Sequence, residues 1–258
     1  MQKQSKNLSS APRRQRLDAL LVKRGFAVSR DRAKNLIIAG AVNIDGKLAQ
    51  KPAKSYTSNC LIEVKLSGNQ WVSRAGLKLA GAARAFQKLE FSGCNALDIG
   101  ASTGGFTEVL ISCGAKHVVA IDVGHGQLHE RLAVDTRVTV LDGTNARYLT
   151  ASVLPFIPDV VVCDVSFISL KKLLPAALGL AQPRARLVTL IKPQFEVGRG
   201  LVGKGGIVRD PALHQHVVAD ITDWLETEMS WVVLETMPSP ITGHDGNAEF
   251  LLLAQKPG

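Results

Sequence analysis

Residues 97–106 read LDIGASTGGF, and this stretch decides the fold of the 258-residue chain. An apolar segment at 94–99 runs directly into the cluster of small residues that begins at Gly100. Small residues after a buried strand let the backbone turn tightly and let a ligand lie against it. The glycines fall as G-x-x-x-G-G and not as the dinucleotide fingerprint G-x-G-x-x-G. The loop therefore suits a nucleoside that has no pyrophosphate.

Apolar runs and helical patterns alternate from this loop to the end of the chain. After the first strand, further strands are expected at 117–122, 137–141, 159–164, 185–191, 230–236 and 248–254. Helices are expected at 75–89, 104–113, 127–133, 169–180 and 211–227. Continuous apolar strands that alternate with helices are typical of a doubly wound parallel sheet. No helix separates the last two strands, so we expect an α/β fold whose Rossmann-like sheet has seven strands, the last one antiparallel.

Acidic residues at two further strand ends extend the ligand site. Asp122 lies 22 residues after Gly100, where a carboxylate can bind ribose hydroxyls. Asp142 follows the third strand 20 residues later, within reach of an adenine edge. The residues expected to bind a nucleoside cofactor are Asp98, Gly100, Ala101, Ser102, Thr103, Gly104, Gly105, Phe106, Asp122, Val123, Asp142 and Gly143.

Positive charge is concentrated in the first third of the chain. The whole sequence has 31 Lys and Arg against 22 Asp and Glu, a net charge of +9. Residues 1–90 contribute 18 basic against 5 acidic residues, and residues 91–258 contribute 13 against 17. A basic surface of this kind favours a polyanion, either a nucleic acid or an anionic membrane.

The basic part of the chain predicts a small separate domain. Residues 17–24 and 30–39 have helical spacing, and short strand-like segments follow around an Asp-Gly turn at 45–46. We expect a flexible basic tail at 1–16, a compact α+β unit at 17–66, a linker at 67–74 and the large domain at 75–258. Basic residues expected to contact RNA are Arg16, Lys23, Arg24, Arg30, Arg32 and Lys34, joined by Arg199 and Lys204 from a mobile glycine-rich flap.

Several motifs occur in a characteristic order along the chain. They are VSRAGLKL at 72–79, LDIGASTGGF at 97–106, AIDVGHGQL at 120–128, CDVSFISL at 163–170, LIKPQFEVGRG at 190–200 and GNAEFLL at 246–252. With these motifs the chain resembles the TlyA family, whose members pair an S4 RNA-binding domain with an FtsJ-like methyltransferase domain. The resemblance implies a cytoplasmic enzyme that uses S-adenosylmethionine to methylate ribose 2′-hydroxyls in ribosomal RNA, with cytidine as the expected nucleotide and ribosomal subunits as partners.

The FtsJ-like resemblance also implies a catalytic tetrad, which falls on Lys78, Asp164, Lys192 and Glu249. Ligands bind at the carboxyl ends of parallel strands, and Asp164 and Lys192 each end a strand. Lysine is protonated at neutral pH, and a nearby cation or burial frees an amine to act as a base. Lys192 is the first choice for the base, and Lys78 could share or replace that role. The two carboxylates would orient the lysines and balance their charge.

Two other functions are weighed against the enzyme. Members of this family are also labelled haemolysins, but no signal peptide or apolar run of membrane-spanning length is found in the sequence. An RNA-binding module with an inactive methyltransferase fold is the second alternative. A metal site is not expected, because the four cysteines form no CxxC pair. Residues 198–204 match the start of a Walker A loop, but Gly205 stands where serine or threonine would bind magnesium.

Overall fold

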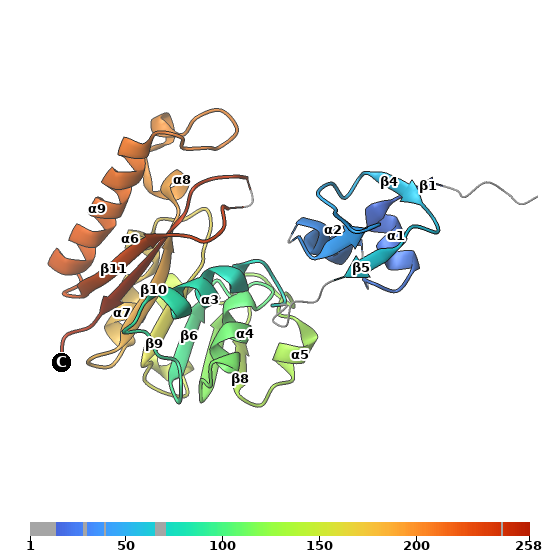
Figure 1. The fold of residues 1–258 in the computed structure, drawn as a ribbon. Coiled ribbons are helices and arrows are strands. Elements are labelled where there is room, and N and C mark those ends of the chain that lie inside the picture. The colour runs from blue at the N-terminus through green and yellow to red at the C-terminus, as the bar shows by residue number, and fades with distance from the viewer. Residues whose placement is uncertain (1–13, 28–29, 39, 65–70, 244) are drawn as a thin grey trace, which may run out of the picture. The chain divides into compact units, whose positions relative to one another are not determined.

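The computed structural model describes residues 14–258 except 28–29, 39, 65–70 and 244, and the side chains of Asp31, Arg32, Asn35 and Arg199 also fall outside the described part. The chain divides into two compact units, Met1–Gln70 and Trp71–Gly258 (Figure 1). Residues 1–13 of the tail expected at 1–16, and residues 67–70 of the linker expected at 67–74, lie outside the described residues.

The first unit packs two helices against short strands. Its helices are α1 (Leu17–Lys23) and α2 (Arg30–Ile38), and its strands are β1 (Arg14–Arg16), β2 (Val42–Ile44), β3 (Lys47–Leu48), β4 (Ser55–Thr57) and β5 (Ile62–Val64). Strand β2 pairs with β3 and β5, and the expected turn between β2 and β3 has positive φ angles of 50° at Asp45 and 76° at Gly46. The apolar residues of both helices and of β2 form one buried core.

Residues 14–16 differ from the expectation of a flexible tail. They form β1, which pairs antiparallel with β4, and the Arg14 guanidinium donates a 2.8 Å hydrogen bond to the carbonyl of Ser55. The partner strand lies about 40 residues away in sequence, so the local composition, which is polar and basic, did not reveal the pairing.

Asp18 is the buried polar centre of this unit. Its side chain is fully buried and accepts hydrogen bonds from Arg16 Nε at 3.1 Å, Arg16 Nη2 at 2.9 Å and Arg30 Nη2 at 3.0 Å. The hydrogen bonds from Arg16, aided by Arg30, hold the pKa of Asp18 well below its ordinary value. Both guanidinium groups remain about half exposed, so Asp18 fixes two arginines at the surface of the unit.

The second unit is built on a seven-stranded sheet in the order β11-β12-β10-β9-β6-β7-β8. Its strands are β6 (Asn95–Ile99), β7 (His117–Ile121), β8 (Val138–Leu141), β9 (Val160–Cys163), β10 (Arg186–Ile191), β11 (Val232–Pro238) and β12 (Phe250–Gln255). Strand β12 lies antiparallel between β10 and β11, which confirms the expected seven-stranded fold with its last strand reversed. The first residues of β12 are therefore at the same edge as the last residues of β9 and β10.

Helices cover both faces of this sheet (Figure 1). They are α3 (Ala75–Ala85), α4 (Gly105–Ser112), α5 (Glu130–Ala133), α6 (Leu170–Leu173), α7 (Pro175–Leu180), α8 (Pro193–Glu196) and α9 (Pro211–Thr227). One core lies under α3 and α4, and the other lies under α6, α7 and α9. The helix expected at 169–180 is divided because Pro175 lacks the backbone N–H that a continuous helix needs there.

Trp71 also differs from its expected place in a linker. Its side chain is buried in the core beneath α3 and α4. The Cα of Gly76 lies so close to it that a Cβ atom there would be 2.4 Å from Trp71 Cβ. The large domain therefore begins at Trp71, and the start of α3 is packed against it.

Replacing Asp18 with alanine should destabilise the first unit. Hydrogen bonds to a charged group contribute about 1.5–3 kcal/mol, so a loss of that order is expected at neutral pH. Because the pKa of Asp18 is lowered by folding, its stabilisation is present above the unfolded-state pKa and disappears as the pH falls through the folded-state value. Urea unfolding followed through the amide NMR signals of Ile37 and Ile44 measures the effect.

The control is Glu63→Ala, because Glu63 is an exposed carboxylate of the same unit. It should leave the urea midpoint unchanged at every pH. The wild-type and Asp18→Ala midpoints should differ at pH 7 and converge in acid. Equal midpoints at pH 7 would contradict the role given to Asp18.

Candidate active site

The loop between β6 and α4 is shaped by glycines that no other residue could replace without movement. Gly100 has a φ of +79°, and a Cβ atom there would lie 2.7 Å from Val165 Cγ1 and 2.9 Å from the carbonyl oxygen of Asp164. Gly104 has a φ of +94°, and a Cβ atom there would lie 2.4 Å from Leu132 Cδ1. Gly100 therefore lets the loop approach the end of β9 closely, and Gly104 lets it approach α5.

A cavity of about 500 Å³ opens beside this loop at the carboxyl ends of β6, β7 and β9. Four residues expected at the cofactor site line it, namely Gly100, Ser102, Asp122 and Val123. Sequence reasoning missed the opposite wall, which is formed by Gln127, Thr144, Asn145, Ala146, Arg147, Val165, Ser166, Phe167, Ile168 and Leu173. Most of these residues follow β8 and β9. Their position just after a strand end was the sequence feature that could have predicted them as cavity residues.

Asp122 stands at the centre of the cavity wall. Its Oδ2 accepts a 2.9 Å hydrogen bond from the backbone N–H of Ser102, and its Oδ1 accepts a 2.7 Å hydrogen bond from that of Gly124. Each carboxylate oxygen has a second lone pair that a ligand hydroxyl can use. Asp122 therefore joins the loop after β6 to the loop after β7 and still presents acceptors to the cavity.

The other residues expected to contact the cofactor do not line this cavity. They are Asp98, Ala101, Thr103, Gly104, Gly105, Phe106, Asp142 and Gly143. Phe106 is buried in the core under α4. The Asp142 carboxylate accepts a 2.7 Å hydrogen bond from the backbone N–H of Gly126, on the turn beside the cavity. Asp142 therefore supports that turn, and Phe106 belongs to the core.

Asp98 lies beneath the loop and is fully buried. Its Oδ2 accepts a 2.6 Å hydrogen bond from the Thr107 hydroxyl, on the first turn of α4. Burial raises the pKa of Asp98 to about 7, and the Thr107 hydrogen bond only partly opposes that effect. Asp98 therefore ties β6 to α4 under the cavity floor.

Lys78, Asp164, Lys192 and Glu249 meet in one cluster beside the cavity. Lys78 Nζ lies 2.7 Å from Glu249 Oε2 and 3.3 Å from Asp164 Oδ2, and Lys192 Nζ lies 2.6 Å from Asp164 Oδ1. These side chains are between 3% and 11% exposed. The two ammonium groups and two carboxylates balance in charge. Asp164 connects the cluster to the cavity, because it belongs to the cluster and also lines the cavity.

Close helix packing places Lys78 in this cluster. A Cβ atom on Gly105, the first residue of α4, would lie 2.3 Å from Ser73 Oγ and 2.8 Å from the backbone nitrogen of Gly76. The first turn of α3 therefore lies directly on the start of α4. One turn of a helix is about 3.6 residues, so Lys78 is held within a turn of this contact.

Glu249 is set by the turn before β12. A Cβ atom on Gly243 would lie 2.6 Å from Glu249 Oε1, and the N–H of Gly243 donates a 2.9 Å hydrogen bond to the carbonyl of Asn247. The buried Asn247 amide donates to the carbonyl of Gly206 at 2.9 Å and accepts from the N–H of Val208 at 3.0 Å. The glycine-rich segment expected to act as a flap is thus anchored at Gly206, its last residue. The anchor is Asn247, which lies two residues before Glu249 in the sequence.

The residues expected to contact RNA have different surroundings. In the first unit, Arg16 and Arg30 are held by Asp18, whereas Arg24 Nη1 donates a 2.6 Å hydrogen bond to the carbonyl of Cys60. Lys23 is exposed, and so is Lys204 in the second unit. One of the Arg24 donors is therefore already used in a hydrogen bond within the first unit.

Neither a membrane-spanning helix nor a metal cluster is found in the described residues. No helix there is long and apolar enough to cross a bilayer. No group of three or more His, Cys, Asp or Glu side chains there could hold a metal ion.

Cys163, in β9, is fully buried.

The cavity fits a nucleoside cofactor. Pockets for such molecules are typically about 300–1,000 Å³, and this one is about 500 Å³ with a carboxylate in its wall. Gly100 has no side chain to fill the space above the strand end. A Rossmann-like sheet with this cavity at its carboxyl edge and a charged cluster beside it defines the class, a Rossmann-like methyltransferase.

Comparisons with known proteins agree with that class. The family model described as FtsJ-like methyltransferase matches residues 71–256, and the S4 domain model matches residues 15–59. A Mycobacterium tuberculosis protein named 16S/23S rRNA (cytidine-2'-O)-methyltransferase TlyA is 49% identical over 93% of this chain and 89% of its own length. The chain therefore belongs to the FtsJ-like methyltransferases, in the TlyA family, which confirms the resemblance seen in the motifs.

Solved structures show the same fold. One from Streptococcus thermophilus, which carries the hemolysin name, is 37% identical and has a TM-score of 0.74, covering 96% of this chain and 90% of that chain. One from Listeria monocytogenes, named for S-adenosylmethionine-dependent methyl transfer, has a TM-score of 0.50 at 15% identity over 70% of this chain and 100% of that chain. The second likeness shows the fold alone.

Replacing Asp122 with alanine should weaken binding of S-adenosylmethionine. A hydrogen bond to a charged group is worth about 1.5–3 kcal/mol, so roughly a 10- to 150-fold loss of affinity is expected. Isothermal titration calorimetry measures it on the full chain. Asp135→Ala is the control, because Asp135 forms its ion pair with Arg137 and does not line the cavity.

Three results are informative in this titration. Selective loss in Asp122→Ala supports the assignment of the carboxylate. Equal affinity of wild type and Asp122→Ala would show that another residue binds the ribose. A wild-type protein that binds no cofactor, with or without RNA, would favour the alternative of a non-catalytic RNA-binding module.

Proposed function

We propose that this protein methylates the 2′-hydroxyl of a ribose, expected to be a cytidine, in ribosomal RNA, with S-adenosylmethionine as methyl donor. The observation that carries the proposal is the charged cluster of Lys78, Asp164, Lys192 and Glu249 at the edge of the cofactor cavity. The name of the Mycobacterium tuberculosis relative supports the substrate class.

The cavity residues would hold the cofactor and leave its reactive end near the cluster. S-adenosylmethionine supplies an electrophilic methyl group on a sulfonium. Asp122 would accept hydrogen bonds from the ribose hydroxyls, and the segment from Thr144 to Arg147 would face the adenine. Asp164, which lines the same cavity, would lie on the side where the RNA ribose enters. Positioning of two reactants in this way contributes strongly to the rate of a displacement.

The contacts of the two lysines differ and favour Lys192 as the base. Lys78 is held between two carboxylates, Glu249 and Asp164, so its ammonium is already engaged in two ion pairs. Among the described residues, Lys192 forms an ion pair with one carboxylate, Asp164, and donates a 3.1 Å hydrogen bond to the Ser166 hydroxyl. In the proposed step, neutral Lys192 Nζ takes the proton of the 2′-hydroxyl as the oxygen attacks, and Asp164 stabilises the ammonium that forms.

The function is tested by mapping methyl groups in ribosomal RNA. The full chain is incubated with S-adenosylmethionine and with ribosomal subunits from cells that lack the protein. Mass spectrometry of RNA digests should then show a new ribose methyl group on one or a few cytidines. A methyl group on a base would contradict the proposed chemistry, and a methylated ribose of another nucleoside would contradict only the cytidine assignment.

Lys192→Arg tests the proposed base. Arginine keeps the positive charge but remains protonated at any practical pH. If Lys192 takes the proton, the variant should bind cofactor and RNA and lose methyl transfer by about 10²–10⁴-fold. Single-turnover rates between about pH 6 and 9 measure the loss, since that range brackets neutral pH.

Lys78→Arg is the matched control for this variant. A lysine that only balances two carboxylates should tolerate the exchange better than the base does. Unchanged unfolding temperatures and cofactor affinities show that both variants remain intact. Near-wild-type rates of Lys192→Arg at every pH would refute the base assignment and leave the methyltransferase proposal standing.

Phe167 is suited to contact the target nucleotide. Its side chain is 90% exposed, lines the cavity mouth three residues after Asp164, and has a φ of +69°. Its ring centroid lies 5.1 Å from that of Phe195, which follows Lys192 on α8. An exposed aromatic ring in an unusual backbone conformation is costly unless it has a use, and bases stack on such rings.

Phe167→Ala should therefore weaken the use of RNA and spare the cofactor. A stacked base is worth about 1–3 kcal/mol, so kcat/KM for ribosomal RNA should fall by roughly 5- to 150-fold. Phe167→Tyr keeps the ring and should retain most of the rate. Ile157→Ala removes another exposed apolar side chain, outside the cavity, and should have no effect. Equal rates for wild type and Phe167→Ala would exclude the stacking contact.

A further inference from the structure

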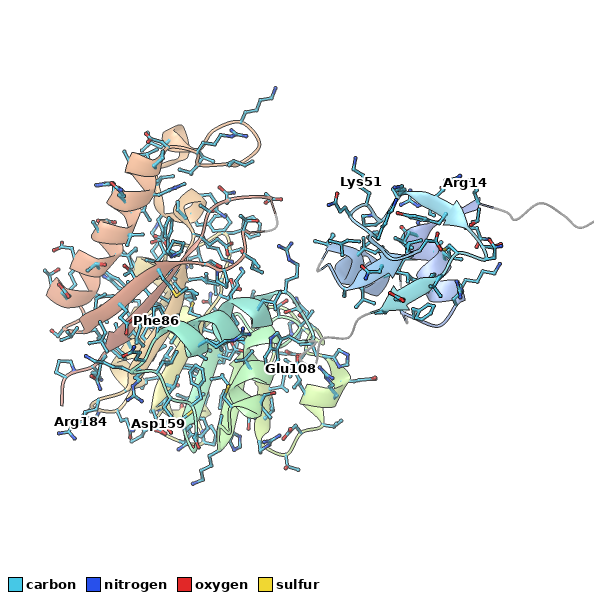
Figure 2. All side chains as sticks on the ribbon, viewed as in Figure 1. Arg14, Lys51, Phe86, Glu108, Asp159 and Arg184 are labelled. Atoms are coloured by element: carbon cyan, nitrogen blue, oxygen red, sulfur yellow. The ribbon has the colours of Figure 1, made fainter. Side chains whose placement is uncertain are left out.

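A second polar pocket lies at the opposite edge of the large sheet. It has a volume of about 370 Å³ and lies where β9 and β10 begin and where the antiparallel β12 ends. The cofactor cavity lies at the carboxyl ends of the parallel strands, so the two sites are separated by the length of the sheet. We call it the arginine pocket and define it by Ser92, Asp159, Gln182, Arg184, Arg186 and Gln255. Figure 2 shows Arg184 and Asp159 at the same end of the domain.

One of the two arginines of this pocket has a buried donor without an acceptor, whereas Arg184 is exposed. The Nε atom of Arg186 is buried and has no hydrogen-bond partner among the described residues. Neither guanidinium forms an ion pair with a described residue. A guanidinium carries five N–H donors and no acceptor, and a buried donor without a partner is unfavourable. The pocket is therefore short of acceptors.

The two acidic residues of the pocket, Asp159 and Glu90, do not supply them. Asp159 Oδ2 accepts a 2.8 Å hydrogen bond from the backbone N–H of Asn95, and Oδ1 accepts a 3.0 Å hydrogen bond from Gln182 Nε2. Asp159 thus joins β6 to the turn before β10. Glu90 also lines the pocket but forms no ion pair with either arginine.

The backbone directs the two arginines to the same side. Arg184 and Arg186 both line the pocket and flank Ala185, whose side chain is buried in the core. Arg184 has a φ of +64°, and its N–H donates to the carbonyl of Lys256 at 3.1 Å. Its own carbonyl accepts a 3.3 Å hydrogen bond from Gln255 Nε2. A non-glycine residue kept in the left-handed region is a feature that clusters at functional sites.

We propose that the arginine pocket binds a phosphate group, and that the source of this phosphate is the backbone of the RNA substrate. Paired guanidinium groups match the oxygens of a phosphate, which would supply the missing acceptors. RNA is the polyanion that the proposed function brings to this domain, and its backbone carries a phosphate at every nucleotide. The phosphate site stands on the pocket itself, whereas its RNA source rests on the proposed function. The site would give the catalytic domain an RNA contact away from the reacting ribose.

The phosphate site is tested with inorganic phosphate on the full chain. The Nε–H signal of Arg186 is followed by ¹⁵N NMR while phosphate is added at constant ionic strength, with chloride as the control salt. A saturable shift with phosphate alone supports the site, and Arg184→Gln should weaken that binding by about 10-fold. A signal that phosphate does not move, or that chloride moves equally, overturns the proposal.

The RNA source is tested by the salt dependence of ribosomal RNA binding. Each neutralised phosphate contributes about 0.7–0.9 to the slope of log K against log salt concentration. The double variant Arg184→Gln/Arg186→Gln should lose a slope of that size. Arg137→Gln is the matched control, because Arg137 comes directly before β8, at the far edge of the same sheet, and is already paired with Asp135.

The two measurements separate the possible failures. A phosphate shift with an unchanged RNA slope would keep the phosphate site and overturn RNA as its source, in favour of a small phosphate compound. A wild-type protein that methylates no ribosomal RNA would overturn the proposed function, while the phosphate titration would still report on the pocket.

Discussion

The double ion pair of Asp164 is the interaction on which the catalytic domain depends. Each of its oxygens faces a different lysine, one from α3 and one from the end of β10. Strand β9 must therefore lie beside β10, α3 must pack on the start of α4, and β12 must run antiparallel so that Glu249 begins at the same edge. Glycines at 76, 100 and 105 permit the close approaches that this arrangement requires.

The burial of this cluster is itself an argument for function. Removing four charged groups from water is costly, and ion pairs in a low-dielectric interior often fail to recover that cost. Apolar residues of similar volume would stabilise the domain at least as well. We propose that the two lysines and two carboxylates stay almost fully buried because they serve the reaction, since a balanced cluster can move a proton between partners without exposing an isolated charge.

Much of this arrangement could be predicted from the sequence, because it depends on strand ends. The apolar runs located all seven strands, and the absent helix before β12 gave its direction. Contacts between distant segments left no local signal. The pairing of Arg14–Arg16 with β4, the burial of Trp71 and the cavity wall at Thr144–Arg147 depend on which segments meet in space. The arginine pocket belongs to the same group, because its residues are polar and lie at strand starts, where motifs for catalysis are not sought.

The surface features that would meet RNA in the large domain are tied to the tetrad by short stretches of backbone. Phe167 follows Asp164 by three residues, its ring partner Phe195 follows Lys192 by three, and Asn247, which anchors the glycine-rich segment, precedes Glu249 by two. A displacement of any of these residues would therefore also move the charged residue of the cluster that lies two or three positions away. Since a shift of about 1 Å in a reacting group can cost about 10²-fold in rate, RNA docked on these contacts would set the geometry of the cluster as well as its own position.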